Sequence, residues 1–324
     1  MRKRFIAIVF FMFVTGVHAQ ERDSVLTVFW NLENFFDYTD QGTGESDAEF
    51  SSLGSRHWSR KKFYRKCDNI AKSLLWMGDR YGRMPDVIGL AEVENRWVLW
   101  KLLNNTLLRK YGYKIVHFDS GDRRGIDVAL LYRESVFRKV SHSLTVPVAG
   151  GERMSTRDML QVCLECVTGQ KINMIVCHHP SKYGGAEESS SRRNAAMEAL
   201  RGLCDSLFSA DRRVPIVAMG DFNDTPDGEQ FWLLDGVLVN KSYSLFTEGY
   251  GTIRYQGAWE LIDMFMVSES LTENSEMDIV QIPFLMTYEK KYPGMKPLRT
   301  YSGPRYIGGV SDHCPIVLCI FGSY

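Results

Sequence analysis

The chain has 324 residues, of which 44% are hydrophobic and 24% are charged, with 39 basic and 39 acidic side chains. This composition is typical of a soluble globular protein, and the length allows one large domain or two ordinary ones. Removing residues 1–20 takes away three basic residues and no acidic one, which leaves a net charge of −3. That charge argues against tight, sequence-blind binding to polyanions.

The first twenty residues have the pattern of a secretory signal peptide. Basic residues at 2–4 precede an apolar run at 5–14, and small residues at 17 and 19 stand at the −3 and −1 positions of a cleavage site. The apolar run is too short for a comfortable membrane span. We therefore expect a secreted or periplasmic protein without a stable membrane anchor. The predicted mature domain is 21–324.

Seven cysteines are present, an odd number. Cys163, Cys166, Cys177 and Cys319 lie in apolar, strand-like runs, where buried thiols are expected. No second pair with zinc-ligand spacing accompanies Cys163 and Cys166, so the pattern does not predict a zinc site. Export would permit a disulfide, but the sequence does not indicate one.

The amino-terminal half alternates between strand and helix patterns. Residues 40–57 form a predicted polar loop. An amphipathic surface helix with a solvated basic face is expected over 58–77. The other predicted elements are strands at 25–30, 86–91, 113–118 and 126–132 and a helix at 96–110.

The carboxyl-terminal half adds antiparallel pieces. Residues 158–167 and 171–177 read as a hairpin, and 283–309 as a long loop that is a candidate for substrate contact. The remaining predictions are strands at 136–148, 214–219, 259–267 and 315–321, helices at 192–209 and 226–234, and a polar loop at 181–191. Strand–helix alternation with inserted hairpins predicts a single mixed-sheet α/β domain from about residue 24 to about residue 322.

The most informative stretch is VPIVAMGDFND, residues 214–224. Its apolar half predicts a strand buried on both faces. Extended residues two apart point the same way, so Asp221 and Asn223 are expected side by side at the carboxyl end of a core strand. The alternative is an Asx-rich turn, which ends many strands.

Other predicted strands also end in Asn, Asp, Glu or His. Together these strand ends favour a functional site over a set of unrelated turns. Hard carboxylate and amide oxygens suit Mg²⁺, Mn²⁺ or Ca²⁺, and histidines handle protons near neutral pH. The set therefore favours metal-assisted hydrolysis at phosphorus. The strand-end residues are Asn31 with Glu33, Glu92, His178, Asp221 with Asn223, and Asp312 with His313.

The chain resembles the endonuclease/exonuclease/phosphatase superfamily from about residue 25 to about residue 320. The matching segments, in order, are WNLENFFD, AEVEN, RRGIDVALLYR, STRDMLQV, CHHPSKYGG, GDFNDTPD, LIDMFMVS and SDHCPI. The resemblance implies an α/β fold, a four-layer sandwich of two packed mixed β-sheets with helices on the outer faces.

The resemblance also implies roles for individual residues. Asn31, Glu92 and Asp312 would bind the metal. Asp221 and Asn223 would orient or activate water and hold the phosphate, and His313 would be oriented by Asp263. His178 would contact the phosphate or assist the leaving group, and Arg157 would contact the phosphate of the substrate. His178 is favoured over His179. Three points stay open: whether His313 or Asp221 is the base, whether Glu33 contributes to the metal site while Glu94 supports it from behind, and whether Asp127 pairs with His178.

The function implied is a divalent-metal-dependent phosphohydrolase that uses Mg²⁺, Mn²⁺ or Ca²⁺. A phosphodiesterase or endonuclease acting on DNA or RNA is the first interpretation, and we expect a monomer. The alternatives are a phosphatase or a sphingomyelinase-like enzyme acting on small or lipid phosphates. A non-catalytic binding protein that keeps the fold is a third possibility.

Overall fold

The computed structural model describes residues 24–182 and 186–322, so the predicted signal peptide lies outside the described residues. The fold is built on two six-stranded sheets. None of the helices in the described ranges combines the length and apolar character needed to cross a membrane. All seven cysteines fall within the described ranges, and none of them forms a disulfide there.

The first sheet contains the strand that opens the domain. β1 runs parallel to β2 and antiparallel to β20. The strand order is β15 (Ser275–Ile279), β20 (Ile316–Ile320), β1 (Val25–Phe35), β2 (Val87–Val93), β4 (Asp127–Arg133) and β3 (Tyr113–His117).

The second sheet is built around the VPIVAMGDFND segment. β10 runs parallel to β9 and antiparallel to β14. The strand order is β11 (Val239–Asn240), β14 (Asp263–Val267), β10 (Ile216–Asp221), β9 (Lys171–His178), β8 (Met159–Cys166) and β5 (Phe137–Thr145). The predicted hairpin is β8 and β9.

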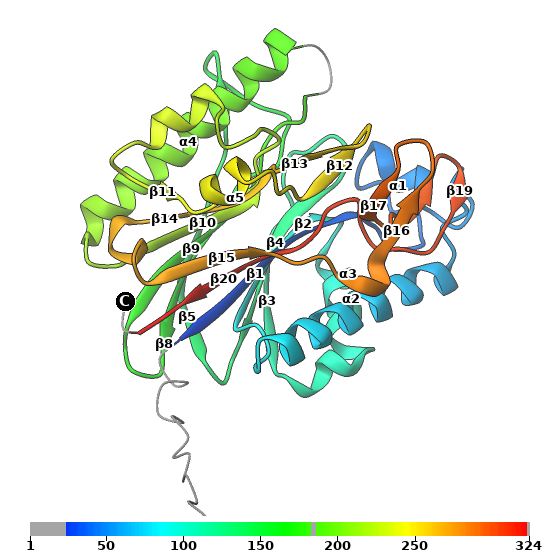
Figure 1. Ribbon diagram of the computed structural model, residues 1–324, viewed down its shortest axis with the longest axis horizontal. Helices are drawn as coiled ribbons and strands as arrows, with labels where there is room; N and C mark the ends of the chain where they lie inside the picture. The colour runs from blue at the N-terminus through cyan, green and yellow to red at the C-terminus, as the bar shows by residue number, and fades with distance from the viewer. Residues whose placement is uncertain (1–23, 183–185, 323–324) are drawn as a thin grey trace, which may run out of the picture.

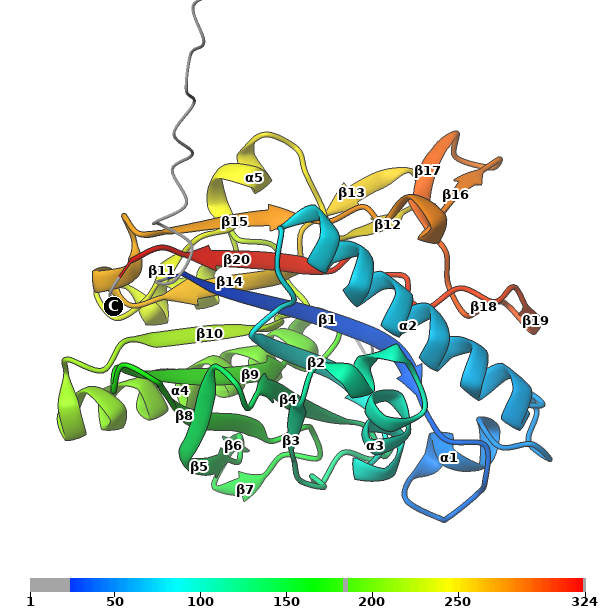
Figure 2. The same ribbon diagram turned by 90° about the horizontal axis from the view of Figure 1, so that it is seen from below.

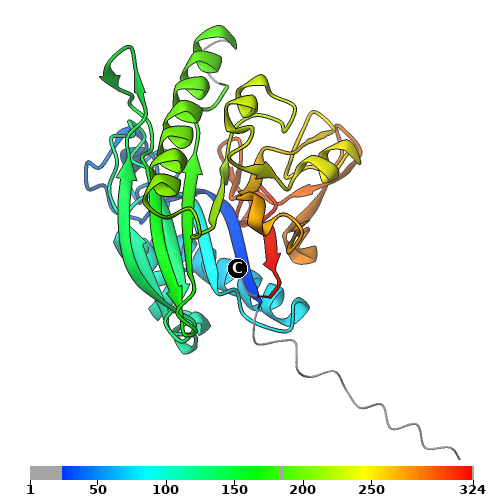
Figure 3. The same ribbon diagram turned by 90° about the vertical axis from the view of Figure 1, so that its left-hand side faces the viewer.

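Three apolar clusters hold the layers together. Phe29 and Leu130 of the first sheet pack with Met174 and Phe265 of the second, so the sheets face each other. The helices α2 (Arg60–Arg80) and α3 (Arg96–Asn104) cover the other face of the first sheet, and α4 (Ala186–Asp211) covers the second. Figure 1 shows α4 on one side of the sheets and α2 with α3 on the other, and Figure 3 shows the second sheet (green) beside the first. The predicted four-layer sandwich is confirmed.

The helix α2 follows the predicted amphipathic pattern. Phe63, Ile70, Leu74 and Met77 recur at helical spacing and are fully buried against the first sheet. Figure 2 shows α2 lying across β1 and β2. Lys66 does not belong to the basic face that was expected to be solvated, because it is buried.

Several predicted boundaries shift for local reasons. The strand expected over 259–267 is interrupted, because Thr252 Oγ1 accepts the N–H groups of both Ile262 and Asp263. The predicted strand is divided into two strands, β13 (Ala258–Glu260) and β14. β13 pairs with β12 (Ile253–Tyr255). Asp263 therefore opens a strand instead of lying inside one.

The helix expected over 96–110 ends at Asn104. Thr106 Oγ1 then accepts the Leu108 N–H and starts a 3₁₀ turn, Leu107–Lys110. The helix expected over 192–209 begins earlier, at Ala186.

The long loop expected at 283–309 contains two hairpins, β16 (Met286–Glu289) with β17 (Gly294–Pro297) and β18 (Tyr301–Ser302) with β19 (Arg305–Tyr306). The pattern did not show these short pairs, nor α1 (Glu45–Glu49), α5 (Tyr243–Thr247), β6 (Val148–Ala149) with β7 (Glu152–Arg153), β11 or β15.

Candidate active site

The parallel strands of the two sheets end at one edge of the sandwich. Asn31 and Glu92 belong to β1 and β2, and His178 and Asp221 close β9 and β10. Asn31 Nδ2 donates to Asp221 Oδ2 at 3.0 Å, which links the two sheets directly. Parallel strand ends meeting at one edge are the usual place for a ligand site in an α/β fold.

The backbone at this edge is irregular. Glu33, Asn34, Glu92 and Asn223 have φ angles of 49°, 56°, 59° and 52°, in the left-handed region. The register of β1 and β2 shifts there, and the Asn34 N–H donates to Glu92 Oε2 at 2.7 Å. Each such residue costs on the order of 1–3 kcal/mol, and such residues cluster at functional sites.

The pair Asp221 and Asn223 differs in detail from the expectation. The chain leaves the extended conformation after Asp221, and the Asn223 N–H donates to Asp221 Oδ1 at 2.9 Å. Asn223 Nδ2 donates to the carbonyl of His179 at 3.0 Å. The Asx turn is therefore real, and it brings Asn223 beside the site by a turn instead of by strand alternation.

His313 is held by Asp263. Nδ1 of His313 lies 2.8 Å from Asp263 Oδ2, and both side chains are buried. Asp263 is the cross-strand partner of Asp221, and His313 Nε2 lies 3.9 Å from Asp221 Oδ2. This geometry fixes the ring with Nε2 directed towards the Asp221 carboxylate.

The charges of Asp221, Asp263 and His313 influence the pKa values of Asp221 and His313. Burial raises the pKa of Asp221 to about 7, helped by the charge of Asp263 and opposed by that of His313. Burial opposes ionisation of His313, but Asp263, Asp221 and Asp312 outweigh it and hold the pKa of His313 well above its ordinary value. These shifts favour the imidazolium form of His313 at neutral pH and bring the titration of Asp221 close to neutral pH.

The two adjacent histidines have different surroundings. His178 Nε2 lies 3.5 Å from Asp221 Oδ2, whereas the His179 ring packs edge-on against Phe222 at 4.8 Å. Burial first, and then the charges of Arg157 and Arg124, lower the pKa of His178 well below its ordinary value. His178 therefore faces the site as a neutral ring.

A cluster of carboxylates adjoins these groups. Glu92 Oε1 lies 3.2 Å from Arg124 Nη1, and Asp312 Oδ2 lies 3.2 Å from Arg299 Nη2. Burial disfavours charge on Glu92, but Arg124 and the Asn34 N–H lower its pKa. Glu92 is therefore a charged carboxylate, and together with the Asn31 amide and Asp312 it offers the hard oxygen donors that Mg²⁺ and Mn²⁺ prefer.

Glu33 lies behind this cluster. Its carboxylate accepts from Arg299 Nε at 2.8 Å and from the Thr300 N–H at 3.1 Å. Burial and the charge of Asp312 raise its pKa to about 7, against the opposing charges of Arg299 and Lys66. Both oxygens of Glu33 are already used, so it ties the loop around Arg299 to the site.

Sequence reasoning missed Lys66 and the full role of Arg124. Lys66 Nζ donates to the Glu33 carbonyl and to Thr300 Oγ1, and burial lowers its pKa to about 8. A signal was present, because Lys66 stands three residues after Phe63 and four before Ile70, on the buried stripe of α2. Arg124 follows no periodic pattern that would have identified it.

Arg157 is placed beside the site but away from Asp221. Its Nη1 lies 3.1 Å from Asp122 Oδ2, and its Nη2 donates to the His179 carbonyl at 2.7 Å. It lines a cavity of about 470 Å³ with three further arginines. We call this cavity the arginine pocket, and its arginines are Arg123, Arg124, Arg157 and Arg192.

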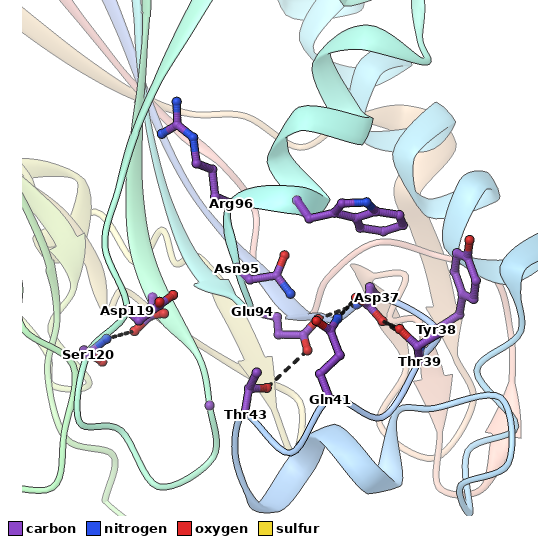
Figure 4. Close-up of a pocket in the computed structure, with 13 residues that line it drawn as sticks. Asp37, Tyr38, Thr39, Gln41, Thr43, Glu94, Asn95, Arg96, Asp119 and Ser120 are labelled. Carbon is purple, nitrogen blue, oxygen red and sulfur yellow. Dashed lines mark hydrogen bonds between the residues drawn. The ribbon is translucent and has the colours of Figure 1, made fainter.

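The remaining candidates lie apart. Asp127 Oδ2 is 3.4 Å from His117 Nε2, so Asp127 is not the partner of His178. Glu94 accepts from the Asp37 N–H at 2.6 Å, and burial raises its pKa to about 8. Glu94, Asp119 and Asp127 line a cavity of about 750 Å³, in which Figure 4 shows Glu94 and Asp119 on opposite sides.

A two-sheet α/β sandwich with a strand-edge site of carboxylates, an asparagine and an aspartate-paired histidine defines a class of phosphate-ester hydrolases. The chain belongs to the Endonuclease/Exonuclease/phosphatase family, whose sequence profile matches residues 26–321. Members of this family are metal-dependent phosphoric ester hydrolases, and the chain is an enzyme of this kind.

Solved structures share the fold at low sequence identity. The human Nocturnin catalytic domain with bound sulfate is 17% identical with a TM-score of 0.58, over 93% of this chain and 96% of that one. A mannosyl-6-phosphatase from Bacteroides thetaiotaomicron is 15% identical with a TM-score of 0.58, over 92% and 100%. D. rerio TDP2 complexed with a single-strand DNA product is 15% identical with a TM-score of 0.53, over 91% and 98%. No curated protein matches the sequence significantly.

Proposed function

We propose that the chain is an exported phosphodiesterase that hydrolyses DNA or RNA by in-line attack of water on phosphorus. The observation that carries the proposal is the His313–Asp263 pair directed at Asp221, at the edge where Asn31 and Glu92 also lie. A fixed imidazolium next to a carboxylate whose pKa is about 7 supplies a donor and a proton acceptor at neutral pH.

In this proposal Asp221 takes the proton from the attacking water. The raised pKa of Asp221, about 7, matches that task at neutral pH, whereas His313 already carries a proton. His313 then acts as a hydrogen-bond donor and positive charge beside the reacting phosphate. Asn223 and the neutral His178 hold phosphoryl oxygens.

The residues that would hold the ion are Asn31, Glu92 and Asp312. Their oxygen donors fit Mg²⁺ first and Mn²⁺ second, with Ca²⁺ also accommodated by such ligands. When bound, a divalent cation offsets negative charge that develops on the phosphate. Arg124 and Arg299 hold the carboxylates of Glu92 and Asp312 in place, and Lys66 holds the backbone carbonyl of Glu33.

The arginine pocket supports a phosphodiester substrate. Arg124 belongs both to this pocket and to the contacts of Glu92, so the pocket adjoins the candidate metal residues. Among the described residues, Asp122 is the one carboxylate that lines the pocket, and it is paired with Arg157. A second phosphate of a nucleic-acid strand would find cationic donors there.

A phosphatase acting on small phosphates is the second candidate. Lys182 and Arg193 both pair with Asp224, and Arg299 pairs with Glu33 and Asp312. These ion pairs remove positive charge from the surface that a long strand would cross, and a net charge of −3 acts in the same direction.

A sphingomyelinase-like action on lipid phosphates is a further alternative.

The test uses purified protein with Mg²⁺ or Mn²⁺, and then with EDTA, on three substrates in parallel. These are plasmid DNA, bis(p-nitrophenyl) phosphate and p-nitrophenyl phosphate. The proposal predicts metal-dependent cleavage of the first two. Cleavage of p-nitrophenyl phosphate alone would replace the phosphodiesterase with the phosphatase, and no cleavage of any of the three substrates would favour the lipid enzyme.

Export rests on the pattern of residues 1–20 and has a separate test. Amino-terminal sequencing of protein recovered from the periplasm or medium should give Gln20 or Glu21 as the first residue. Full-length protein confined to the cytoplasm would overturn it.

A further inference from the structure

We propose that His117, Asp119 and Asp127 form a second metal site, separate from the candidate active site, that binds a divalent cation of the Zn²⁺ type. One atom from each of the three side chains lies within 4.8 Å of the other two. None of these residues belongs to the set proposed to bind the catalytic ion. An imidazole nitrogen with carboxylate oxygens is a common ligand set for Zn²⁺.

The first sheet presents two of the ligands on one face. His117 ends β3 and is the cross-strand partner of Ala129 in β4. Asp127 opens β4 two residues before Ala129, so it points to the same side of the sheet as His117. Asp119 follows in the loop that joins the two strands. A short β-connection therefore supplies all three groups from nearby backbone positions.

The distance between the two buried ligands fits a shared ion better than a hydrogen bond. His117 Nε2 and Asp127 Oδ2 are 3.4 Å apart. Two ligands at about 2.0–2.1 Å from a tetrahedral ion stand about 3.3 Å from each other. By contrast, the hydrogen-bonded pair of His313 and Asp263 is separated by 2.8 Å.

His117 offers a nitrogen that needs a partner. Its side chain is 2% exposed, and Nε2 makes no hydrogen bond within the part of the chain that the structure describes. A buried polar atom without a partner is costly. Asp127 is positioned independently, because its Oδ1 accepts the Ser120 N–H at 2.9 Å. That contact leaves Oδ2 free to face His117.

The surroundings would favour a cation and give it a way in. Asp119 and Asp127 line the 750 Å³ cavity together with Asp37 and Glu94. Figure 4 shows Asp119 and Ser120 at one side of this cavity. Asp119 is exposed, so its carboxylate can adjust to the ion, and water from the cavity can complete the coordination.

An ion at this position would fasten the loop from 118 to 126. That loop carries Arg123 and Arg124, which line the arginine pocket on its other side. Arg124 in turn contacts Glu92 and Asn34. The metal site would therefore act as a structural clip that holds Arg124 next to the active site.

The test measures how many ions bind and where. Apo protein is titrated with Zn²⁺ by calorimetry, and Co²⁺ is used as a second probe because its visible absorption reports coordination number. The variants are His117→Ala, Asp119→Asn and Glu92→Gln, with His142→Ala as the control, since His142 is exposed and stacks on Phe118 without being one of the proposed ligands. Circular dichroism of each apo variant confirms that it is folded.

We expect one Zn²⁺ site that survives in Glu92→Gln and His142→Ala. It should be lost in His117→Ala and weakened at least tenfold in Asp119→Asn, whose exposed side chain can change without disturbing the core. The intense visible absorption band of four-coordinate Co²⁺ should disappear in His117→Ala and in none of the other variants. Identical Zn²⁺ stoichiometry and affinity in wild type and in both His117→Ala and Asp119→Asn would overturn the site. Loss of all Zn²⁺ binding in Glu92→Gln would also overturn the site, because His117 and Asp127 would then be a buried pair that binds no ion.

Discussion

Asp263 Oδ2 lies 2.8 Å from His313 Nδ1, and the two buried side chains are 50 residues apart in the sequence. An asparagine in place of Asp263 would keep the shape but not the charge that supports the imidazolium. Asp263→Asn is expected to lower kcat by about 10²–10⁴-fold, the range for a positioned acid–base group. Steady-state hydrolysis of bis(p-nitrophenyl) phosphate measures the loss.

The double variant Asp263→Asn with His313→Ala distinguishes positioning from general damage. If Asp263 acts through His313, the double variant is no slower than His313→Ala alone. Multiplication of the two losses would contradict the coupling. Unchanged thermal unfolding of each variant shows that the fold is intact.

The pH profile tests which group takes the proton. Asp221 must be deprotonated to accept a proton and its pKa is raised to about 7, so activity should rise as the pH increases through about 7. His313 must keep its proton and its pKa is well above 6.5, so activity should fall only at higher pH. The dependence of kcat/KM on pH gives both limbs. A profile in which activity falls through about pH 7 would assign the base to another group.

The arginine pocket makes a prediction about substrate binding. Arg192→Ala removes a cation from the pocket and should raise the KM for an oligonucleotide by about tenfold, the equivalent of one charge-assisted hydrogen bond, with kcat unchanged. The KM for bis(p-nitrophenyl) phosphate, which carries a single phosphate, should not change. Arg138→Ala is the matched control, because Arg138 is exposed and pairs with Glu165. Equal KM increases in both variants would show a general charge effect.

His179 makes a prediction about stability. Burial, with the charges of Arg157 and Arg193, lowers its pKa to about 3 from 6.5, so between these pH values the unfolded chain binds a proton that the folded chain does not. This residue therefore reduces the free energy of unfolding as the pH falls below 6.5, by up to about 1.4 kcal/mol per pH unit. His179→Phe should remove that dependence, because neither ring nitrogen makes a hydrogen bond within the described residues and the ring contact with Phe222 can persist.

Urea unfolding of wild type and His179→Phe at pH 7, 6, 5 and 4 measures the difference. The variant should gain stability relative to wild type as the pH decreases. If the free energies of unfolding of the two proteins changed in parallel with pH, His179 would take up its proton over the same pH range in the folded chain as in the unfolded chain.

Lys66 makes a structural prediction. Its ammonium group joins the Glu33 carbonyl to Thr300 Oγ1 beneath the site. Lys66→Met keeps the apolar stem but leaves those oxygens without a donor, which should cost about 1–3 kcal/mol of unfolding free energy. Lys72→Met, on the same helix, should cost much less, since its side chain is exposed. Chemical denaturation of the two variants compares them, and equal costs would mean that the buried contacts of Lys66 contribute nothing.

The layers of the fold could be predicted because apolar periodicity records which face of an element is buried. The stripe of Phe63, Ile70 and Leu74 gave α2, and the apolar run before Asp221 gave β10. Short hairpins such as β16 with β17 could not be predicted, since a few paired residues leave no period. The break before Asp263 depends on Thr252, which precedes β12, a contact that no local pattern contains.

The candidate site was predictable in its members but not in its geometry. Strand ends carrying Asn, Asp, Glu and His are visible in sequence, and the structure brings Asn31, Glu92, His178 and Asp221 to one edge. The left-handed turns at Glu92 and Asn223 were not visible, because non-glycine residues adopt them only under tertiary constraint. The catalytic roles of the site residues are predictions, which the variants described above test.

The most direct test of the account compares wild type and Glu92→Gln in the hydrolysis of bis(p-nitrophenyl) phosphate, with Mg²⁺ and with EDTA. Calorimetric Mg²⁺ titration of the same two proteins accompanies the assay. We expect EDTA to abolish hydrolysis by the wild type. In Glu92→Gln, both activity and Mg²⁺ binding should be lost while the fold is retained. Full Mg²⁺-dependent activity in Glu92→Gln would contradict the proposed site.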